Sequence, residues 1–244
     1  LVFIMMLVSR KVFTCGISSL ESIPTVINYF VSKKTKAIVN GFNHKRIDLV
    51  EKDKSNNSHF NKSSKIKILC VGALNNTKNQ IALLEVLKKT RIDGEIIFLG
   101  DGENKKFLIE YSKYVSNFIK VTFKGLVSRD LAIEHMLEAD VFISLSKGEG
   151  LPIAVLESMY AGCFMILSKI PPHKEVQPPS ERCFFVDISN KDEIVNSLSH
   201  VRDNIEKIRN YRSISKKHAI SNFSVNNMLS DYMKSYNAIY KDNH

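Results

Sequence analysis

The residues of this chain that could do chemistry lie close together between Ser144 and Cys163, around two carboxylates. Glu149 and Glu157 are separated by seven residues, and a Gly-Leu-Pro turn stands between them. Pro152 suits the first turn of a helix, where its missing N–H removes no hydrogen bond. A helix that begins there directs unpaired backbone N–H groups at whatever lies in front of it, which favours an anion such as phosphate. The segment therefore predicts a helix that starts at an anion-binding turn.

Glu157 is the more informative acid because its neighbours are apolar. Four apolar residues precede it directly, from Ile153 to Leu156, and Met159 follows. A carboxylate in such surroundings is costly unless it has hydrogen-bond donors. Two interpretations stay open: a sugar diol supplies two hydroxyls to the carboxylate, or a Lys or Arg forms a salt bridge with it.

The 244 residues, 44% of them hydrophobic, can build one large domain or two small ones. No apolar run reaches the length of a membrane-spanning helix, and the opening run Leu1–Val8 is also too short for the core of a signal peptide. We interpret Leu1–Val8 as a core helix or strand. Because the chain does not begin with Met, we expect it to be a fragment.

The four cysteines, at positions 15, 70, 163 and 183, stand far apart in apolar surroundings. They form no Cys-x-x-Cys pair, and the seven histidines form no metal-binding motif such as His-Glu-x-x-His. We therefore expect buried thiols in a reducing, cytoplasmic compartment, and neither a metal nor another cofactor.

The net charge of +10 raises the question of a polyanionic partner. The lysines are spread over the whole chain among Asn and Ser, without a nucleic-acid-binding motif. We interpret them as a solvated surface and expect no nucleic-acid partner. The second interpretation is attraction to a phosphorylated substrate or to anionic lipid, which would place the protein peripherally at the inner face of a membrane.

From Lys65 onward, short apolar runs alternate with helical patterns, which is typical of βαβ units in an α/β, doubly wound parallel sheet. Ser128 is the expected N-cap of a helix over Arg129–Ala139. The expected strands are Ile66–Gly72, Glu95–Gly100, Ile119–Gly125, Val141–Leu145, Phe164–Leu167 and Cys183–Val186. Further helices are expected at about Lys78–Thr90, around Phe107–Tyr111, at Glu193–Val201, at about Asp203–Asn222 and along an apolar stripe from Met228 to Tyr240.

This topology predicts where a ligand binds. In an open parallel sheet of order 3-2-1-4-5-6, ligands bind beyond the carboxyl ends of the first and fourth strands. The loops there are Gly72–Lys78 and Ser146–Pro152. We therefore expect Lys78 to meet Glu149 and Glu157 at one crevice and to pair with phosphate. A dinucleotide site is excluded, because Gly100-Asp-Gly102 lacks the third glycine and the acidic ribose ligand.

From Ile66 to about Tyr240 the chain resembles the C-terminal, donor-binding domain of glycosyltransferase family 4, which has the GT-B fold. The two spaced glutamates and Ala161-Gly-Cys163 match the family pattern. Five other segments match it in the same order along the chain: Val71-Gly-Ala-Leu-Asn-Asn-Thr-Lys78, Phe98-Leu-Gly-Asp-Gly102, Phe123-Lys-Gly125, Ala139-Asp-Val-Phe-Ile-Ser144 and Ile170-Pro-Pro-His-Lys-Glu-Val176.

The resemblance implies four parts of the chain. Residues 1–50 would be the remnant of an N-terminal acceptor domain with its hinge, and residues 51–65 a polar surface linker. Residues 66–222 would be the nucleotide-sugar-binding domain, and residues 223–244 a helix that returns to the first domain.

The resemblance also implies a chemistry: transfer of a hexosyl group, with retention of configuration and usually without a metal, to a glycan or lipid-linked acceptor in surface polysaccharide synthesis. Lys78 would neutralise the diphosphate, Glu149 would face the donor sugar and Glu157 would bind the ribose. The implied catalytic residues are Glu149 and Lys78. The implied donor-binding residues are Gly72, Lys78, Glu149, Gly150, Leu151, Pro152, Ile153 and Glu157.

One position departs from the family pattern. Ala73 stands where the family commonly has an arginine that serves as a second diphosphate cation, so leaving-group stabilisation is weaker or another residue such as Lys147 replaces it. Two alternatives stay open beside the transferase: a non-catalytic module that binds a nucleotide sugar or a partner, and a sugar-nucleotide epimerase with the same fold.

Overall fold

A computed structural model describes residues 2–57, 65–115, 118–210 and 212–241. Its main feature is a six-stranded, wholly parallel sheet with the order β5-β4-β3-β6-β7-β8, which is the order 3-2-1-4-5-6 assumed above for the position of the crevice. The strands are β3 (Ile66–Val71), β4 (Gly94–Leu99), β5 (Ile119–Gly125), β6 (Val141–Ser144), β7 (Phe164–Ser168) and β8 (Cys183–Val186). The α/β doubly wound class predicted from the sequence is confirmed.

Helices cover both faces of this sheet, because the central strands are apolar on both sides. One apolar core lies between the sheet and the helices α5 (Gln80–Leu87), α6 (Lys105–Ser112), α10 (Lys191–Asp203) and α11 (Ile205–Asn210). The second core lies between the other face and the helices α4 (His44–Asn57), α7 (Arg129–Glu138), α8 (Ile153–Tyr160), α9 (Pro171–Val176) and α12 (Ser213–Phe223). The two layers of helices hold the strand ends, and with them the loops, in fixed positions.

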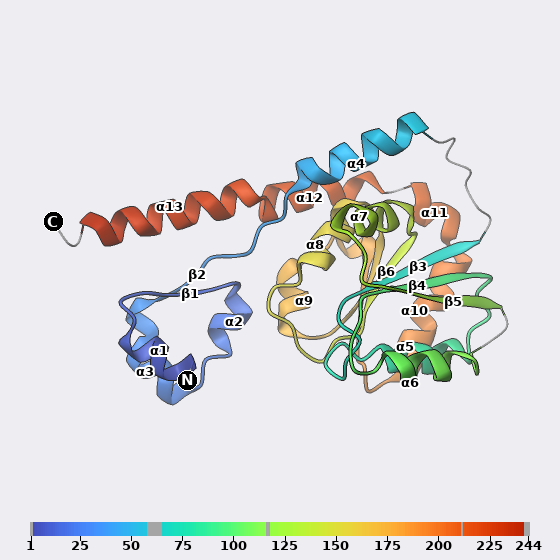
Figure 1. The fold of residues 1–244 in the computed structure, drawn as a ribbon, viewed down its shortest axis with the longest axis horizontal. Coiled ribbons are helices and arrows are strands. Elements are labelled where there is room, and N and C mark those ends of the chain that lie inside the picture. Colours follow the sequence, from blue (N-terminus) through green and yellow to red (C-terminus); the bar gives the residue numbers. More distant parts are fainter. Residues whose placement is uncertain (1, 58–64, 116–117, 211, 242–244) are drawn as a thin grey trace.

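A small unit precedes this domain and lies beside it (Figure 1). Its strands β1 (Val12–Thr14) and β2 (Thr35–Ala37) pair in parallel, and its helices are α1 (Val2–Val8), α2 (Ile17–Glu21), α3 (Thr25–Val31) and the 3₁₀ turn Ser32–Lys34. The long helix α13 (Val225–Lys241) runs from the large domain over this unit (Figure 1). There Tyr232 packs edge-on against Phe13 at 5.7 Å, and Lys36 donates to Ser235 at 3.1 Å. The end of the chain therefore ties the two parts together.

The prediction of a polar surface linker over 51–65 is wrong for residues 51–57, which form the second half of α4. This helix packs on the large domain: Lys216 pairs with Glu51 at 2.6 Å, and Lys54 pairs with Glu138 of α7. The polar composition hid the helix because only one narrow side is apolar, with Ile47 fully buried. Residues 58–64 of the expected linker lie outside the described residues.

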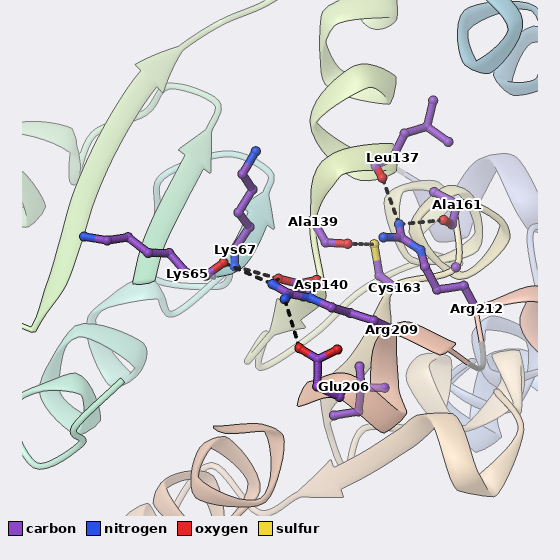
Figure 2. A network of polar contacts seen from close by, with 12 residues as sticks. Lys65, Lys67, Leu137, Ala139, Asp140, Ala161, Cys163, Glu206, Arg209 and Arg212 are labelled. Carbon is purple, nitrogen blue, oxygen red and sulfur yellow. Dashed lines mark hydrogen bonds and ion pairs between the residues drawn. The ribbon is translucent and has the colours of Figure 1, made fainter. Parts of the chain in front are cut away.

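The expected helix over about 203–222 is also divided, into α11 and α12. Arginines near this division hold the amino-terminal edge of the sheet (Figure 2). The Asp140 carboxylate, which precedes β6, accepts from Arg209 Nε and Nη2 at 2.9 Å each and from the Lys67 backbone N–H at 2.9 Å. Arg212 donates to the carbonyls of Leu137 and Ala161 at 2.8 and 3.0 Å. The helices that close the domain are thus anchored at the edge opposite the expected crevice.

None of the helices in the described part of the chain is long and apolar enough to cross a membrane.

Candidate functional site

Two loops meet where the order of the strands reverses, between β3 and β6. Lys78, from the loop after β3, donates from Nζ to both carboxylate oxygens of Glu149, at 2.6 Å each. Glu149 comes from the loop after β6, and Ser146 donates to it at 2.7 Å. A backbone hydrogen bond of 2.8 Å from Lys147 to Thr77 joins the loops directly. The structure therefore brings together Lys78 and Glu149, which are 71 residues apart in the sequence.

The backbone of the first loop positions the side chain of Lys78. Gly72 has φ +149°, a conformation that side chains disfavour, and a Cβ built on it would lie 3.5 Å from Lys78 Cε. The Lys78 N–H donates to the Asn75 side chain at 2.9 Å, and Asn79 has φ 56° just before α5 begins. The lysine stem therefore lies over Gly72 and its ammonium points across the crevice to Glu149.

The second loop leads into α8. Pro152 is the N-cap residue, one position before the first helical residue Ile153, so the predicted helix start is displaced by one residue. Leu151 is buried, and a Cβ built on Gly150 would lie 3.3 Å from the Cys15 sulfur of the small unit. Glu149–Ile153, the central part of the expected donor-binding set, thus form one continuous turn, and the small unit contacts it.

Glu157 lies on α8, is 5% exposed and forms an ion pair with Arg129 at the start of α7. This salt bridge is the second of the two interpretations left open by the sequence. Burial raises the pKa of the Glu157 carboxyl, although Arg129 and Arg46 act in the opposite direction. Lys78 and Glu149 are in contact, but Glu157 has a cation of its own, so the expected convergence of all three is seen for the first two only.

Sequence reasoning missed two residues of this region. Arg129 was interpreted only as a helical residue, yet its guanidinium is half-exposed beside Glu157 and adds a cation that Ala73 does not provide. Lys147, the other expected substitute, has an exposed side chain. An arginine directly after an N-cap serine could have been recognised as pointing away from the core, but its partner could not.

His173 on α9 is the second. Its ring is fully buried, and Nδ1 lies 3.0 Å from Ser168 Oγ and 3.2 Å from the Ser168 carbonyl. Burial lowers the pKa of His173 to about 4; the hydrogen bond to the Ser168 carbonyl and the charge of Glu149 act in the opposite direction, and the charge of Lys78 lowers the pKa further. The imidazole is therefore neutral at pH 7 and contacts Ser168, the last residue of β7.

Among the described residues, no three His, Cys, Asp or Glu side chains form a group that could hold a metal ion.

The family model described as "Glycosyl transferases group 1" matches residues 51–218, more than half of the chain. The capsular polysaccharide biosynthesis glycosyltransferase CapH of Staphylococcus aureus is 32% identical over 171 residues, covering 67% of this chain and 43% of CapH. The O-antigen biosynthesis glycosyltransferase WclY of Escherichia coli is 29% identical over 149 residues, covering 60% and 39%. The chain thus spans about two fifths of the length of these curated relatives.

Among solved structures, HepE of Anabaena in complex with UDP and glucose superposes with a TM-score of 0.76 at 16% identity, covering 94% of this chain and 63% of HepE. Sucrose-phosphate synthase of Thermosynechococcus elongatus superposes with a TM-score of 0.80 at 15% identity, covering 98% and 61%. These likenesses show the fold, and they extend over the small unit as well as the large domain.

Proposed function

Since this chain belongs to the glycosyl transferases of group 1, we propose that it forms the donor-binding part of a retaining, family 4 enzyme. The enzyme would move a hexosyl group from a nucleotide-diphospho-sugar to a glycan or lipid-linked acceptor in surface polysaccharide synthesis. In this proposal the chain is one piece of a longer protein, whose remainder supplies most of the acceptor domain.

The contact between Lys78 and Glu149 is the observation that carries the proposal. It lies at the reversal of strand order, where open parallel sheets bind ligands. A diphosphate that enters there competes with Glu149 for the ammonium, since both are anions within reach of one cation. When Lys78 turns to the diphosphate, the Glu149 carboxylate is released toward the sugar. The lysine then stabilises the negative charge that develops on the leaving diphosphate.

Glu157 is assigned to the nucleotide ribose. Arg129 contacts its Oε1, which leaves Oε2 as the oxygen that accepts a ribose hydroxyl. A buried carboxylate that is already held by a guanidinium is a rigid acceptor, because its rotamer is fixed before the ligand arrives. The turn Gly150–Ile153 would offer its backbone N–H groups to the sugar and the diphosphate.

The relatives favour this chemistry. CapH and WclY are named for capsular polysaccharide and O-antigen biosynthesis, and HepE was solved with UDP and glucose. UDP is therefore a suitable first probe for this chain, and GDP serves as the comparison nucleotide.

Calorimetry with UDP and GDP tests the donor site. We expect one of them to bind the wild-type chain, and Lys78→Met to weaken its affinity by about 10- to 100-fold through loss of a charge-assisted contact. Lys113→Met is the matched control, since Lys113 is exposed at the C-cap of α6 and its ammonium pairs with Glu110. Absence of binding by the wild type, or equal affinities of all three proteins, would refute the site.

A second assay tests catalysis and separates the transferase from a non-catalytic binding module, which Ala73 favours. In Glu149→Gln the shape of the side chain is kept while its charge is lost. We expect this variant to bind UDP at least as tightly as the wild type, because the carboxylate that competes for Lys78 is gone. We also expect it to lose most of the release of UDP from UDP-glucose. A wild-type chain that binds UDP tightly but never releases it from any donor sugar would favour the binding module.

A further inference from the structure

Besides the contacts of α13, one carboxylate joins the small unit to the large domain. Glu175 on α9 accepts from the Ile17 backbone N–H at 2.6 Å, from the Ser18 backbone N–H at 2.9 Å and from the Ser18 hydroxyl at 2.6 Å. Both carboxylate oxygens are therefore used at the first residues of α2. Three hydrogen bonds donated to one carboxylate fix direction as well as distance, because its two oxygens lie in one plane.

The backbone at this contact leaves no space for a larger side chain. A Cβ built on Gly16 would lie 2.9 Å from each oxygen of Glu175, although the extended backbone of Gly16 is one that any residue can adopt. Space, rather than conformation, is what glycine provides here. The neighbouring Cys15 then reaches the donor loop, where a Cβ on Gly150 would lie 3.3 Å from its sulfur.

The opposite side of α9 is connected to the crevice. His173, two residues before Glu175, contacts Ser168, and Ser168 Oγ donates to the Ser146 carbonyl at 2.6 Å. Ser146 in turn donates to Glu149 at 2.7 Å. The same short helix thus holds the small unit with one side chain and the Glu149 loop with another.

We propose that Glu175 is a positioning residue that holds the segment Cys15–Ser18 of the small unit against the donor loop, so that this segment forms one wall of the crevice. Its link to donor binding rests on the function proposed above. Without the Glu175 contact, α2 loses its acceptor and the wall moves away from Gly150.

Cys15 is a reporter of this position. The other three cysteines are buried, and burial raises the pKa of Cys70 to about 12, of Cys163 to about 11 and of Cys183 to about 12. Thiolates react with iodoacetamide and buried neutral thiols do not. In the native chain at pH 8, the rate of alkylation measured by mass spectrometry therefore reports on Cys15 alone.

The experiment compares alkylation rates among four proteins. In Glu175→Gln one neutral oxygen replaces the charged pair, and we expect Cys15 to react about tenfold faster than in the wild type. Gly16→Ala disturbs the same contact from the other side and is expected to have the same effect. Glu181→Gln, at an exposed position of the following 3₁₀ turn, is the control and is expected to react within about twofold of the wild type.

Folding is followed by circular dichroism. A variant that unfolds is also recognised by rapid reaction of all four cysteines. A folded Glu175→Gln or Gly16→Ala protein in which Cys15 reacts at the wild-type rate overturns the proposal. A purely local stabilising role of Glu175 would lower the melting temperature without this selective exposure, and that result overturns it too.

UDP distinguishes this inference from the proposed function. We expect UDP to raise the melting temperature of the wild type and of Glu175→Gln, but to slow alkylation of Cys15 only in the wild type. If UDP slows alkylation equally in both, the positioning role fails while the donor site stands. If UDP has no effect on either protein and Glu175→Gln still reacts tenfold faster, the positioning role stands and the donor site fails.

Discussion

We expect acidification to destabilise the fold through His173, because this buried ring is neutral in the folded chain and its protonated form is costly there. Nδ1 lies 3.2 Å from the Ser168 carbonyl, which can only accept, so Nδ1 carries the proton of the neutral ring. Nε2 is then the atom that must take up a second proton. It is buried and has no hydrogen-bond partner among the described residues. Burial is the main reason why a charge is costly there; Lys78 adds to this cost, and Glu149 offsets part of it.

The size of the effect follows from the pKa of His173, which burial lowers from 6.5 to about 4. Between these values the unfolded chain binds a proton that the folded chain refuses, so the free energy of unfolding falls as the pH falls. The contribution is fully present above about pH 6.5 and is lost progressively down to about pH 4. A tenfold change in an equilibrium corresponds to about 1.4 kcal/mol, so the total loss is about 3 kcal/mol.

Urea denaturation of the wild type and of His173→Gln at pH 7.5 and at pH 4.5 measures this loss. Contributions from the other ionisable groups are common to both proteins and cancel in the comparison. We expect the wild type to lose about 2–3 kcal/mol more than the variant over this interval. His200→Gln is the control, since His200 is exposed on α10, and it should follow the wild type.

Equal losses in the wild type and in His173→Gln would refute the argument, because they would mean that the ring is protonated in the folded state without cost. If the pH-dependent loss of stability were also absent in His200→Gln, it could not be assigned to His173.

Two further predictions concern buried ion pairs. In Arg129→Met the carboxylate of Glu157 loses its cation, and because Arg129 is half-exposed we expect a loss of about 1–2 kcal/mol in the free energy of unfolding at pH 7. The raised pKa of Glu157 means that its neutral form suits the fold, so this loss should shrink at pH 4; equal losses in urea at both pH values would contradict it. Asp140→Asn leaves the largely buried Arg209 with the exposed Glu206, 3.6 Å away, as its remaining carboxylate among the described residues. The change should cost about 3 kcal/mol, measured by urea denaturation at pH 7. Asp203→Asn, at an exposed position, is the control and should cost less than about 0.5 kcal/mol. If Asp140→Asn were as stable as Asp203→Asn, the network around Asp140 would have no anchoring role.

Much of the fold could be predicted from the sequence because its signals are local. Each strand of the large sheet is a short, continuous apolar run, and the structure places every one of the six within a residue or two of the expected bounds. Ser128 accepts from the Leu131 N–H at 3.2 Å, as expected of an N-cap. Helix α4 was missed because its polar surface is typical of a connector, and a single buried residue such as Ile47 does not form a readable period.

The candidate site divides in the same way. Lys78 and Glu149 could be paired from the sequence, because parallel topology alone brings the ends of β3 and β6 to one edge. Arg129 and Glu175 could not be assigned, because their partners Glu157 and Ser18 are determined by how α7 packs beside α8 and how the small unit docks on α9.

By itself, the sequence determined the alternation of strands and helices and the parallel, doubly wound class, because these follow from hydrophobic periodicity and from the handedness of βαβ connections. The meeting of the two loops was predicted for one assumed strand order, and the structure has that order. Tertiary structure alone decided that Glu157 pairs with Arg129 and that the segment Cys15–Ser18 lies against the donor loop. Side-chain pairing depends on distances of a few ångströms between elements far apart in the chain, and those distances exist only once the helices have packed.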